Sequence, residues 1–235
     1  MGRKDYGDNK KIIRILIMKK YIVYIGVVGQ IACGKGVLVD YLIKKLGFVS
    51  FSLSSILHEE LKKKGIKEFT RKTLQDIGDQ LRKRYGDDVL ARRAIERIKF
   101  YFSSEAKRSR ENSSRQARTI NNQRWVIEGI RNPGEIEFLK KNPSFILIGV
   151  KANRELRFKR LLERTRPWDP KTWNDFIKVD RRDLGVGQKK SGQQVGKCLA
   201  YCDYILTNNK DQKDFHRKVK ELMKHVFKLN GVHHY

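Results

Sequence analysis

The chain has 235 residues and a mass of 27.6 kDa, which suits one domain or one domain with an insertion. Its 53 Lys and Arg residues against 26 Asp and Glu give a formal charge of +27, which indicates anionic partners such as nucleotides or nucleic acid, or a strongly solvated surface. Three cysteines exclude a disulfide framework and suit a reducing compartment, and no apolar run is long enough to cross a bilayer, so the sequence predicts a cytoplasmic protein without a membrane partner.

Short apolar runs alternate with amphipathic stretches along most of the chain. Residues 1–20 come first and are interpreted as a basic extension, with seven basic and two acidic residues. The apolar runs predict strands buried on both faces, at 21–28, 48–53, 125–130, 145–150 and 204–206. The stretches between them predict helices at 35–46, 55–64, 71–84, 88–102, 134–141, 153–164, 171–183 and 211–229. This alternation predicts right-handed βαβ crossovers and a three-layer α/β/α fold.

Two stretches lack such patterns. Residues 103–123 contain almost no apolar side chains and are interpreted as a basic insertion or a frayed helix end. Residues 185–196 hold four glycines and predict a flexible loop. We therefore expect one domain over 21–210, followed by a C-terminal helix and tail over 211–235.

Residues 29–36 read Gly-Gln-Ile-Ala-Cys-Gly-Lys-Gly, between an apolar strand and a predicted helix. This is the Gly-x-x-x-x-Gly-Lys phosphate loop in its expected setting. Glycines let the backbone approach phosphate closely, loop amides and the helix N-terminus supply positive partial charge, and the lysine reaches the β- and γ-phosphates. The residues predicted to bind ATP are Gly29, Gln30, Ile31, Ala32, Cys33, Gly34, Lys35, Gly36 and Val37.

The hydroxyl that usually follows the lysine and touches Mg²⁺ is absent, because Gly36 and Val37 stand there. Magnesium would then be held by phosphates, water and acidic groups elsewhere. Glu128 ends the apolar run in Trp-Val-Ile-Glu-Gly-Ile-Arg and is the candidate to orient Mg²⁺ through water. The alternative is that Glu128 caps the helix that follows.

Together these stretches resemble the P-loop nucleoside-monophosphate kinase superfamily, and look most like dephospho-CoA kinase-like and archaeal adenylate-kinase-like proteins. The resemblance rests on GQIACGKG (29–36), QLRKRYGDDVLARRAI (80–95), VIEGIRNPGEIEFL (126–139), RFKRLLERTRPWDPKTWNDFIKVDRRDLGVG (157–187) and AYCDYILTNN (200–209). It implies a P-loop NTPase fold with a five-stranded parallel sheet, a helical acceptor-binding segment at about 52–102 and a lid at about 160–186. It also implies ATP- and Mg²⁺-dependent phosphoryl transfer to a small nucleotide-type acceptor, either a nucleoside or deoxynucleoside monophosphate or dephospho-CoA.

The resemblance also assigns roles to single residues. It implies acceptor binding by residues after the second strand and by two arginines, namely Ser52, Ser54, His58, Arg82 and Arg131. His58 departs from the arginine that is frequent at its position. The implied catalytic residues are Lys35, Arg160, Arg164, Arg166, Arg182 and Glu128, with Glu128 as the base for a hydroxyl acceptor. Asp180 and Asp183 are expected to orient the lid arginines, or simply to form pairs along one helix.

Two other functions stay open. A nucleic-acid-associated P-loop ATPase would explain the charge, with residues 1–20 and 103–124 following a phosphate backbone. A nucleotide-binding protein with weakened catalysis would explain the departures at Val37 and His58. The sequence leaves the acceptor and the oligomeric state undecided.

Overall fold

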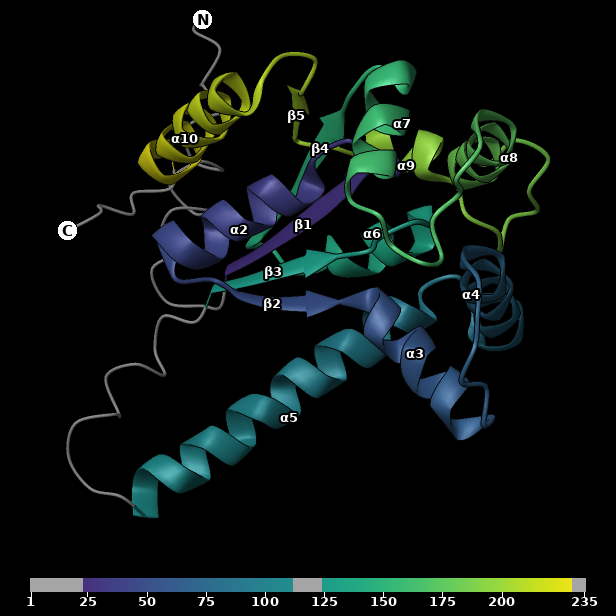
Figure 1. The fold of residues 1–235 in the computed structure, drawn as a ribbon. Helices are drawn as coiled ribbons and strands as arrows, with labels where there is room; N and C mark the ends of the chain where they lie inside the picture. The colour runs from purple at the N-terminus through teal and green to yellow at the C-terminus, as the bar shows by residue number, and fades with distance from the viewer. Residues whose placement is uncertain (1–22, 112–123, 230–235) are drawn as a thin grey trace, which may run out of the picture.

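A five-stranded sheet forms the centre of the protein, and all its neighbouring strands run parallel (Figure 1). The coordinates are a computed structural model that describes residues 23–111 and 124–229. The strand order is β2-β3-β1-β4-β5. The strands are β1 (Val23–Gly29), β2 (Val49–Ser52), β3 (Arg124–Glu128), β4 (Phe145–Lys151) and β5 (Tyr204–Thr207).

Helices lie on both faces of this sheet. They are α2 (Lys35–Leu46), α3 (Leu53–Lys63), α4 (Arg71–Tyr85), α5 (Val89–Glu111), α6 (Pro133–Leu139), α7 (Arg154–Glu163), α8 (Trp173–Leu184), α9 (Val195–Ala200) and α10 (Gln212–Leu229). The predicted three-layer α/β/α fold with a five-stranded parallel sheet is thereby confirmed. Among the helices of the described ranges, none has the length and hydropathy needed to cross a bilayer.

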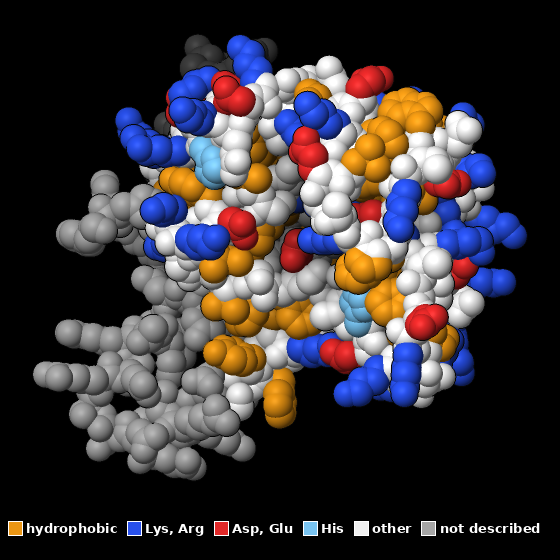
Figure 2. Space-filling model, in the orientation of Figure 1, with side chains coloured by type: hydrophobic (Ala, Val, Ile, Leu, Met, Phe, Trp, Pro, Cys, Tyr) orange, Lys and Arg blue, Asp and Glu red, His pale blue; other side chains and the backbone are white. Residues whose placement is uncertain are grey.

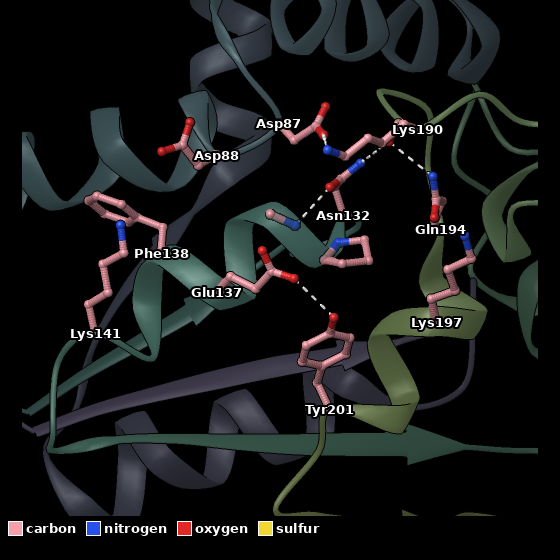
Figure 3. A pocket seen from close by; sticks show the side chains of 12 residues that line it. Asp87, Asp88, Asn132, Glu137, Phe138, Lys141, Lys190, Gln194, Lys197 and Tyr201 are labelled. Atoms are coloured by element: carbon pink, nitrogen blue, oxygen red, sulfur yellow. Dashed lines mark hydrogen bonds and ion pairs between the residues drawn. The ribbon is translucent and has the colours of Figure 1, made fainter.

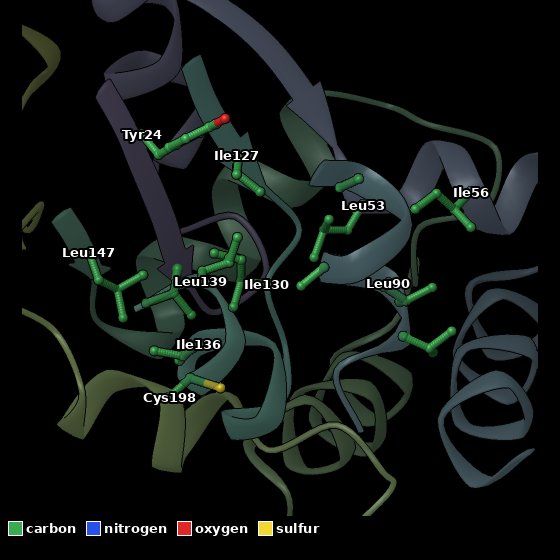
Figure 4. Close-up of a cluster of buried hydrophobic side chains, with 14 of the residues drawn as sticks. Tyr24, Leu53, Ile56, Leu90, Ile127, Ile130, Ile136, Leu139, Leu147 and Cys198 are labelled. Atoms are coloured by element: carbon green, nitrogen blue, oxygen red, sulfur yellow. The ribbon is translucent and has the colours of Figure 1, made fainter. Parts of the chain in front are cut away.

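The alternation of side chains along β1 explains the two layers. Val23, Ile25 and Val27 pack on α2 and α10, whereas Tyr24 and Val28 pack on the helices of the opposite face. Figure 4 shows part of that second cluster, where Tyr24 and Ile127 of the strands meet residues of α3, α5, α6 and α9. Since each buried Val, Leu or Ile contributes roughly 1.5–3 kcal/mol, burial on both faces stabilises the sheet strongly.

The structure changes several predicted boundaries. Helix α5 continues to Glu111, so the first part of the predicted insertion 103–123 is helical, whereas residues 112–123 lie outside the described ranges, as do residues 1–20. Helix α10 buries Phe215, Val219 and Phe227 in the core beside α2 and is therefore part of the domain.

The glycine-rich stretch 185–196 is held in place by hydrogen bonds, contrary to the predicted flexible loop. Asn132 Nδ2 donates to the carbonyls of Lys190 and Gly192 at 2.8 and 2.9 Å. Gln194 Nε2 donates to the carbonyl of Lys190 at 2.9 Å. Helix α9 begins directly afterwards and buries Cys198, whose thiol pKa is raised by burial, so Cys198 is an inert packing residue.

Candidate functional site

The loop between β1 and α2, which the sequence predicts to bind phosphate, forms a cradle at the carboxyl edge of the sheet (Figure 1). Gly34 caps α2 with a φ of +105°, and a Cβ there would lie 2.2 Å from Asn208 Nδ2. A Cβ on Gly29 would lie 2.3 Å from the carbonyl oxygen of Val150. Both glycines are thus required by close contacts of the loop with β4 and the end of β5.

Asn208, which follows β5, supports the cradle through hydrogen bonds. Its Nδ2 donates to the carbonyl of Cys33 at 3.0 Å, and its own backbone amide donates to the carbonyl of Lys151 at 2.8 Å. Arg160 Nη1 in turn donates to the Asn208 carbonyl at 3.0 Å. The sequence resemblance marked this region as the last strand without indicating that it touches the phosphate loop.

Lys35 folds back over the loop that precedes it. Its Nζ donates to the carbonyls of Gly29 and Gln30, both at 2.7 Å. Burial lowers the pKa of Lys35, while the neighbouring Cys33 and Asp183 act to raise it. An anion in the cradle would accept hydrogen bonds from the same ammonium and relieve part of this desolvation.

One cleft of about 490 Å³ opens over the cradle. The residues lining it are Ile31, Ala32, Cys33, Gly34, Lys35, Gly36, Val37, Ser52, Ser54, Leu57, His58, Arg71, Leu74, Gln75, Glu128, Gly129, Arg131, Arg160, Arg164, Arg166, Trp168 and Gln193. Six of these side chains are Lys or Arg, and Glu128 is the one carboxylate among them. The cleft is therefore suited to bind several negative charges at once.

Most predicted site residues line this cleft. Residues 31–37 of the phosphate loop do so, and so do three lid arginines, Arg160, Arg164 and Arg166. From the predicted acceptor set the cleft contains Ser52, Ser54, His58 and Arg131. The Ser52 and Ser54 hydroxyls lie 2.9 Å apart, and the His58 ring packs edge-on against Phe69.

Two predicted arginines, Arg82 and Arg182, are not among the residues that line the cleft. Arg82 is 2% exposed and its Nε donates to Glu135 Oε1 at 2.9 Å. Glu135 in turn accepts from the backbone amide of Arg131 at 2.7 Å, so Arg82 supports the loop that carries Arg131. Arg182 Nη2 donates to Asp76 and Asp79 of α4 at 2.6 and 3.0 Å.

Arg131 is oriented by a buried carboxylate on α8. Its Nη1 donates to Asp183 Oδ1 at 2.6 Å, and Gln75 Nε2 of α4 donates to the same oxygen at 3.3 Å. Gln75 also donates to Gln193 Oε1 at 2.9 Å. The partners expected for Asp183 were lid arginines; the structure instead gives it Arg131, which follows β3.

Sequence reasoning missed Arg71, at the start of α4. Arg71 Nη2 donates to Asp169 Oδ1 at 3.2 Å, and Arg164 Nε donates to Asp169 Oδ2 at 2.6 Å. Within the described part of the chain, Arg71 Nε and Arg164 Nη2 are buried without a hydrogen-bond partner. Because both arginines line the cleft, these two donors are suited to hydrogen-bond an anion bound there. The sequence did not indicate Arg71 because its position in the cleft depends on a tertiary contact with Asp169.

Glu128 closes the cleft at the end of β3, in register with Ser52 of β2 and Val27 of β1. Burial raises the pKa of Glu128, and the charges of Lys35 and Arg166 act to lower it. No group of three or more His, Cys, Asp or Glu side chains able to hold a metal occurs in the described ranges. One carboxylate beside phosphate oxygens nevertheless fits Mg²⁺, which retains water and takes few protein ligands.

A second pocket, of about 550 Å³, lies over α6 and α9 (Figure 3). Several polar side chains that line this pocket pair with one another. Tyr201 donates to Glu137 at 3.0 Å, and Lys190 lies 3.8 Å from Asp87. Figure 2 shows Lys and Arg side chains spread around the whole face rather than gathered into one stripe. Of these two pockets, the cleft over the cradle has the excess of positive charge, since three lysines balance three carboxylates in the lining of the pocket over α6 and α9.

The chain is similar to several solved structures and to several sequence relatives. No protein-family model matches the chain. Among solved structures, shikimate kinase from Acinetobacter baumannii in complex with shikimate has 16% identity and a TM-score of 0.49 over 89% of this chain and 95% of that one. Dephospho-CoA kinase from Campylobacter jejuni has 19% identity and a TM-score of 0.44 over 89% of this chain and 100% of that one.

Sequence relatives are archaeal. A UPF0200 protein from Staphylothermus marinus is 28% identical over 215 residues, covering 91% of this chain and 97% of the relative. A UPF0200 protein from Methanothermobacter thermautotrophicus is 30% identical over 207 residues, covering 86% and 90%. With this identity over nearly the full length of both proteins, the chain belongs to the UPF0200 family.

Proposed function

We propose that the protein transfers the γ-phosphoryl group of ATP to a small nucleotide-type acceptor. The observation that carries the proposal is that the phosphate loop and arginines from three other parts of the chain line one cleft: Arg71 of α4, Arg131 after β3, and Arg164 and Arg166 after α7. A simple nucleotide-binding site needs the loop and its lysine. The further cations that line the same cleft suit a second anionic substrate.

The donor side of the reaction is the cradle. Loop amides and the N-terminus of α2 would bind the β- and γ-phosphates, and Lys35 would exchange its two carbonyl contacts for phosphate oxygens. Arg164 and Arg166 line the same cleft and would contact the γ-phosphoryl group. Because the transition state spreads charge over the equatorial phosphoryl oxygens, planar and bidentate guanidinium groups stabilise it well.

On the acceptor side, Arg71 and Arg131 would bind the anionic group of the acceptor. The bond between the γ-phosphorus and the bridging oxygen of ATP breaks, and a bond to an acceptor oxygen forms. For a monophosphate acceptor, the attacking phosphate oxygen needs no base. For a 3′-hydroxyl, as in dephospho-CoA, Glu128 would accept the proton, and its raised pKa suits that role.

Magnesium would bind to the phosphates, with Glu128 orienting its water shell and the Ser52 and Ser54 hydroxyls nearby. When bound, it supplies neutralisation of charge on the β- and γ-oxygens. Gly36 and Val37 provide no hydroxyl for it.

ADP formation with a panel of acceptors tests the proposal: each nucleoside and deoxynucleoside monophosphate, then dephospho-CoA, with ATP and Mg²⁺. Turnover should require one acceptor and be lost in Lys35→Ala. Arg131→Lys should raise the KM for the acceptor. Lys44→Ala is the matched control, because Lys44 lies on the same helix and makes only an exposed pair with Asp40. Hydrolysis of ATP that is independent of acceptor would contradict the proposal.

The charge of +27 supports a second candidate, an ATPase associated with nucleic acid. Binding through a phosphate backbone weakens steeply with salt, so a salt titration of RNA binding separates this function from small-molecule phosphoryl transfer. ATP hydrolysis stimulated by RNA at low salt, with no small acceptor required, would favour the ATPase.

A further inference from the structure

Asp180, on the lid helix α8, makes a buried ion pair directly behind the phosphate loop. Its side chain is fully buried. Arg157 of α7 donates to it from both terminal nitrogens, Nη1 to Oδ1 at 2.6 Å and Nη2 to Oδ2 at 2.9 Å. Arg154 Nε adds a third contact at 3.3 Å. A bidentate pair of this kind fixes α7 and α8 relative to each other.

The same pair contacts two consecutive residues of the phosphate loop. Gln30 Nε2 donates to Asp180 Oδ1 at 3.2 Å, and Arg157 Nη1 donates to the Ile31 carbonyl at 3.3 Å. The next residue, Ala32, has a φ of +57°. A residue with a Cβ is disfavoured in that conformation by about 1 kcal/mol or more, so the loop depends on outside contacts to keep its shape.

One turn further along α8, two other side chains contact Arg131 and helix α4. Asp183 accepts hydrogen bonds from Arg131 and Gln75, and Arg182 donates to Asp76 of α4. Residues 180 and 183 are three apart on one helix and thus lie on neighbouring parts of its surface. Helix α8 therefore contacts both the cradle and helix α4.

We propose that Gln30 is a positioning residue that couples nucleotide binding to the lid helix α8 through Asp180. Its side chain was expected to serve ATP directly, but it points from the loop to Asp180, and it does not line the cleft. A shift of the loop around bound phosphate moves the Gln30 amide and thereby the Asp180–Arg157 pair. Occupation of the cradle and the position of α8 then depend on each other. This inference rests on the proposed binding of ATP at the cradle.

Trp173 provides a readout at the far end of α8. It packs against Phe158 and Phe176, with ring centroids 5.3 and 5.5 Å away, and does not line the cleft. The chain has three tryptophans. Trp168 lines the cleft and is replaced by Phe in all variants, whereas Trp125 is buried at the opposite end of β3 from Glu128 and supplies a constant background.

The experiment titrates each Trp168→Phe protein with ADP and Mg²⁺, following heat of binding and Trp173 fluorescence. The parent protein, which carries Trp168→Phe as its only substitution, should bind ADP and change its fluorescence. Gln30→Ala should bind about 5- to 10-fold more weakly, in the range expected for one ordinary hydrogen bond, and should lose most of the fluorescence change at saturation. Gln30→Glu has the same size but sets a carboxylate against Asp180, and should weaken binding more than Ala does.

The outcomes are distinguishable. If the parent does not bind ADP, the proposed function fails. If the parent binds and Gln30→Ala keeps both its affinity and its fluorescence change, the coupling is overturned while ATP binding stands. Asp180→Asn is unsuitable as the main variant, because it would leave Arg157 buried without its counter-charge and so destabilise the whole fold.

Discussion

The guanidinium of Arg131, which lines the cleft, lies 2.6 Å from the carboxylate of Asp183 on helix α8. Asp183 is fully buried, and within the described ranges its second oxygen, Oδ2, has no hydrogen-bond partner. Burial acts to raise the pKa of Asp183, but the charges of Arg131 and Arg71 outweigh it and hold the pKa below its usual value. The ionised form is therefore the one that the fold stabilises.

Replacing Asp183 by Asn should lower the free energy of unfolding by about 3–5 kcal/mol, because it leaves buried arginine charge uncompensated. Chemical denaturation at neutral pH measures the effect. Asp40→Asn is the matched control, since Asp40 pairs with Lys44 at the surface, and it should cost less than about 1 kcal/mol. Equal effects of the two changes would contradict the role assigned to Asp183. The stabilisation from Asp183 should be full above the pKa of an unfolded aspartate and disappear as the pH falls through the lower folded value.

The two glycines that flank Lys35 should respond in opposite ways to alanine. Gly34→Ala places a Cβ in a left-handed conformation and 2.2 Å from Asn208 Nδ2, so it should destabilise the protein by at least about 1–2 kcal/mol and weaken ADP binding. A Cβ on Gly36 would meet no atom of the described residues within 4 Å, so Gly36→Ala should stabilise α2 by about 0.5–1 kcal/mol. Thermal melting of both variants checks the contrast, which a similar loss in each would refute.

Gly36→Ser should restore the hydroxyl that this phosphate loop lacks. If Mg²⁺ is held by phosphates and Glu128 without that ligand, the new hydroxyl should lower the Mg²⁺ concentration for half-maximal activity by on the order of a few-fold. Gly36→Ala serves as the control, since it adds the same Cβ without oxygen. Identical Mg²⁺ dependence of the two variants would show that the hydroxyl position does not reach the metal.

The protonation of Glu128 should determine the pH below which Mg²⁺ binding weakens. Burial raises its pKa, with Lys35 and Arg166 opposing, so the carboxylate is protonated at a higher pH than an ordinary glutamate. Affinity for Mg²⁺ in the presence of ADP should therefore fall as the pH decreases through this raised value. Glu128→Gln should bind Mg²⁺ more weakly and remove this pH dependence. A pH dependence that persists in Glu128→Gln would assign it to another group.

Arg71→Lys should raise the KM for the acceptor about tenfold while changing kcat less, because a lysine cannot keep the contact with Asp169 and also present a second donor to an anion. Steady-state kinetics with the acceptor identified in the panel measure the changes in KM and kcat separately. Lys72→Met is the control, since Lys72 occupies the next position of the helix and makes an exposed pair with Asp76. An unchanged KM in Arg71→Lys would remove Arg71 from the acceptor site.

The sequence predicted the elements whose signals are local. Strands β1 and β4 are apolar on both faces, which is a direct consequence of burial between two helical layers, and the Gly-Lys spacing of the phosphate loop identifies its backbone shape. Both features could be predicted because neither depends on contacts between segments that are far apart in the sequence.

Contacts between distant segments escaped prediction from the sequence. Arg71 lies in no recognised motif, and its importance comes from Asp169, 98 positions away. Arg82 lies in a motif that matches the kinase superfamily, yet its guanidinium forms a buried ion pair with Glu135. With 53 basic residues, pattern alone cannot say which arginines face substrate and which are neutralised by a carboxylate.

Helix α10 carries a consequence for how the protein is made. Phe215 packs within the cluster under β1, and its ring would lie 3.6 Å from a Cβ on Gly34, so the last described helix supports the cradle formed near the start of the domain. During translation the loop at 29–36 emerges long before α10. On the ribosome, the cradle can therefore gain its full support only after α10 has been synthesised.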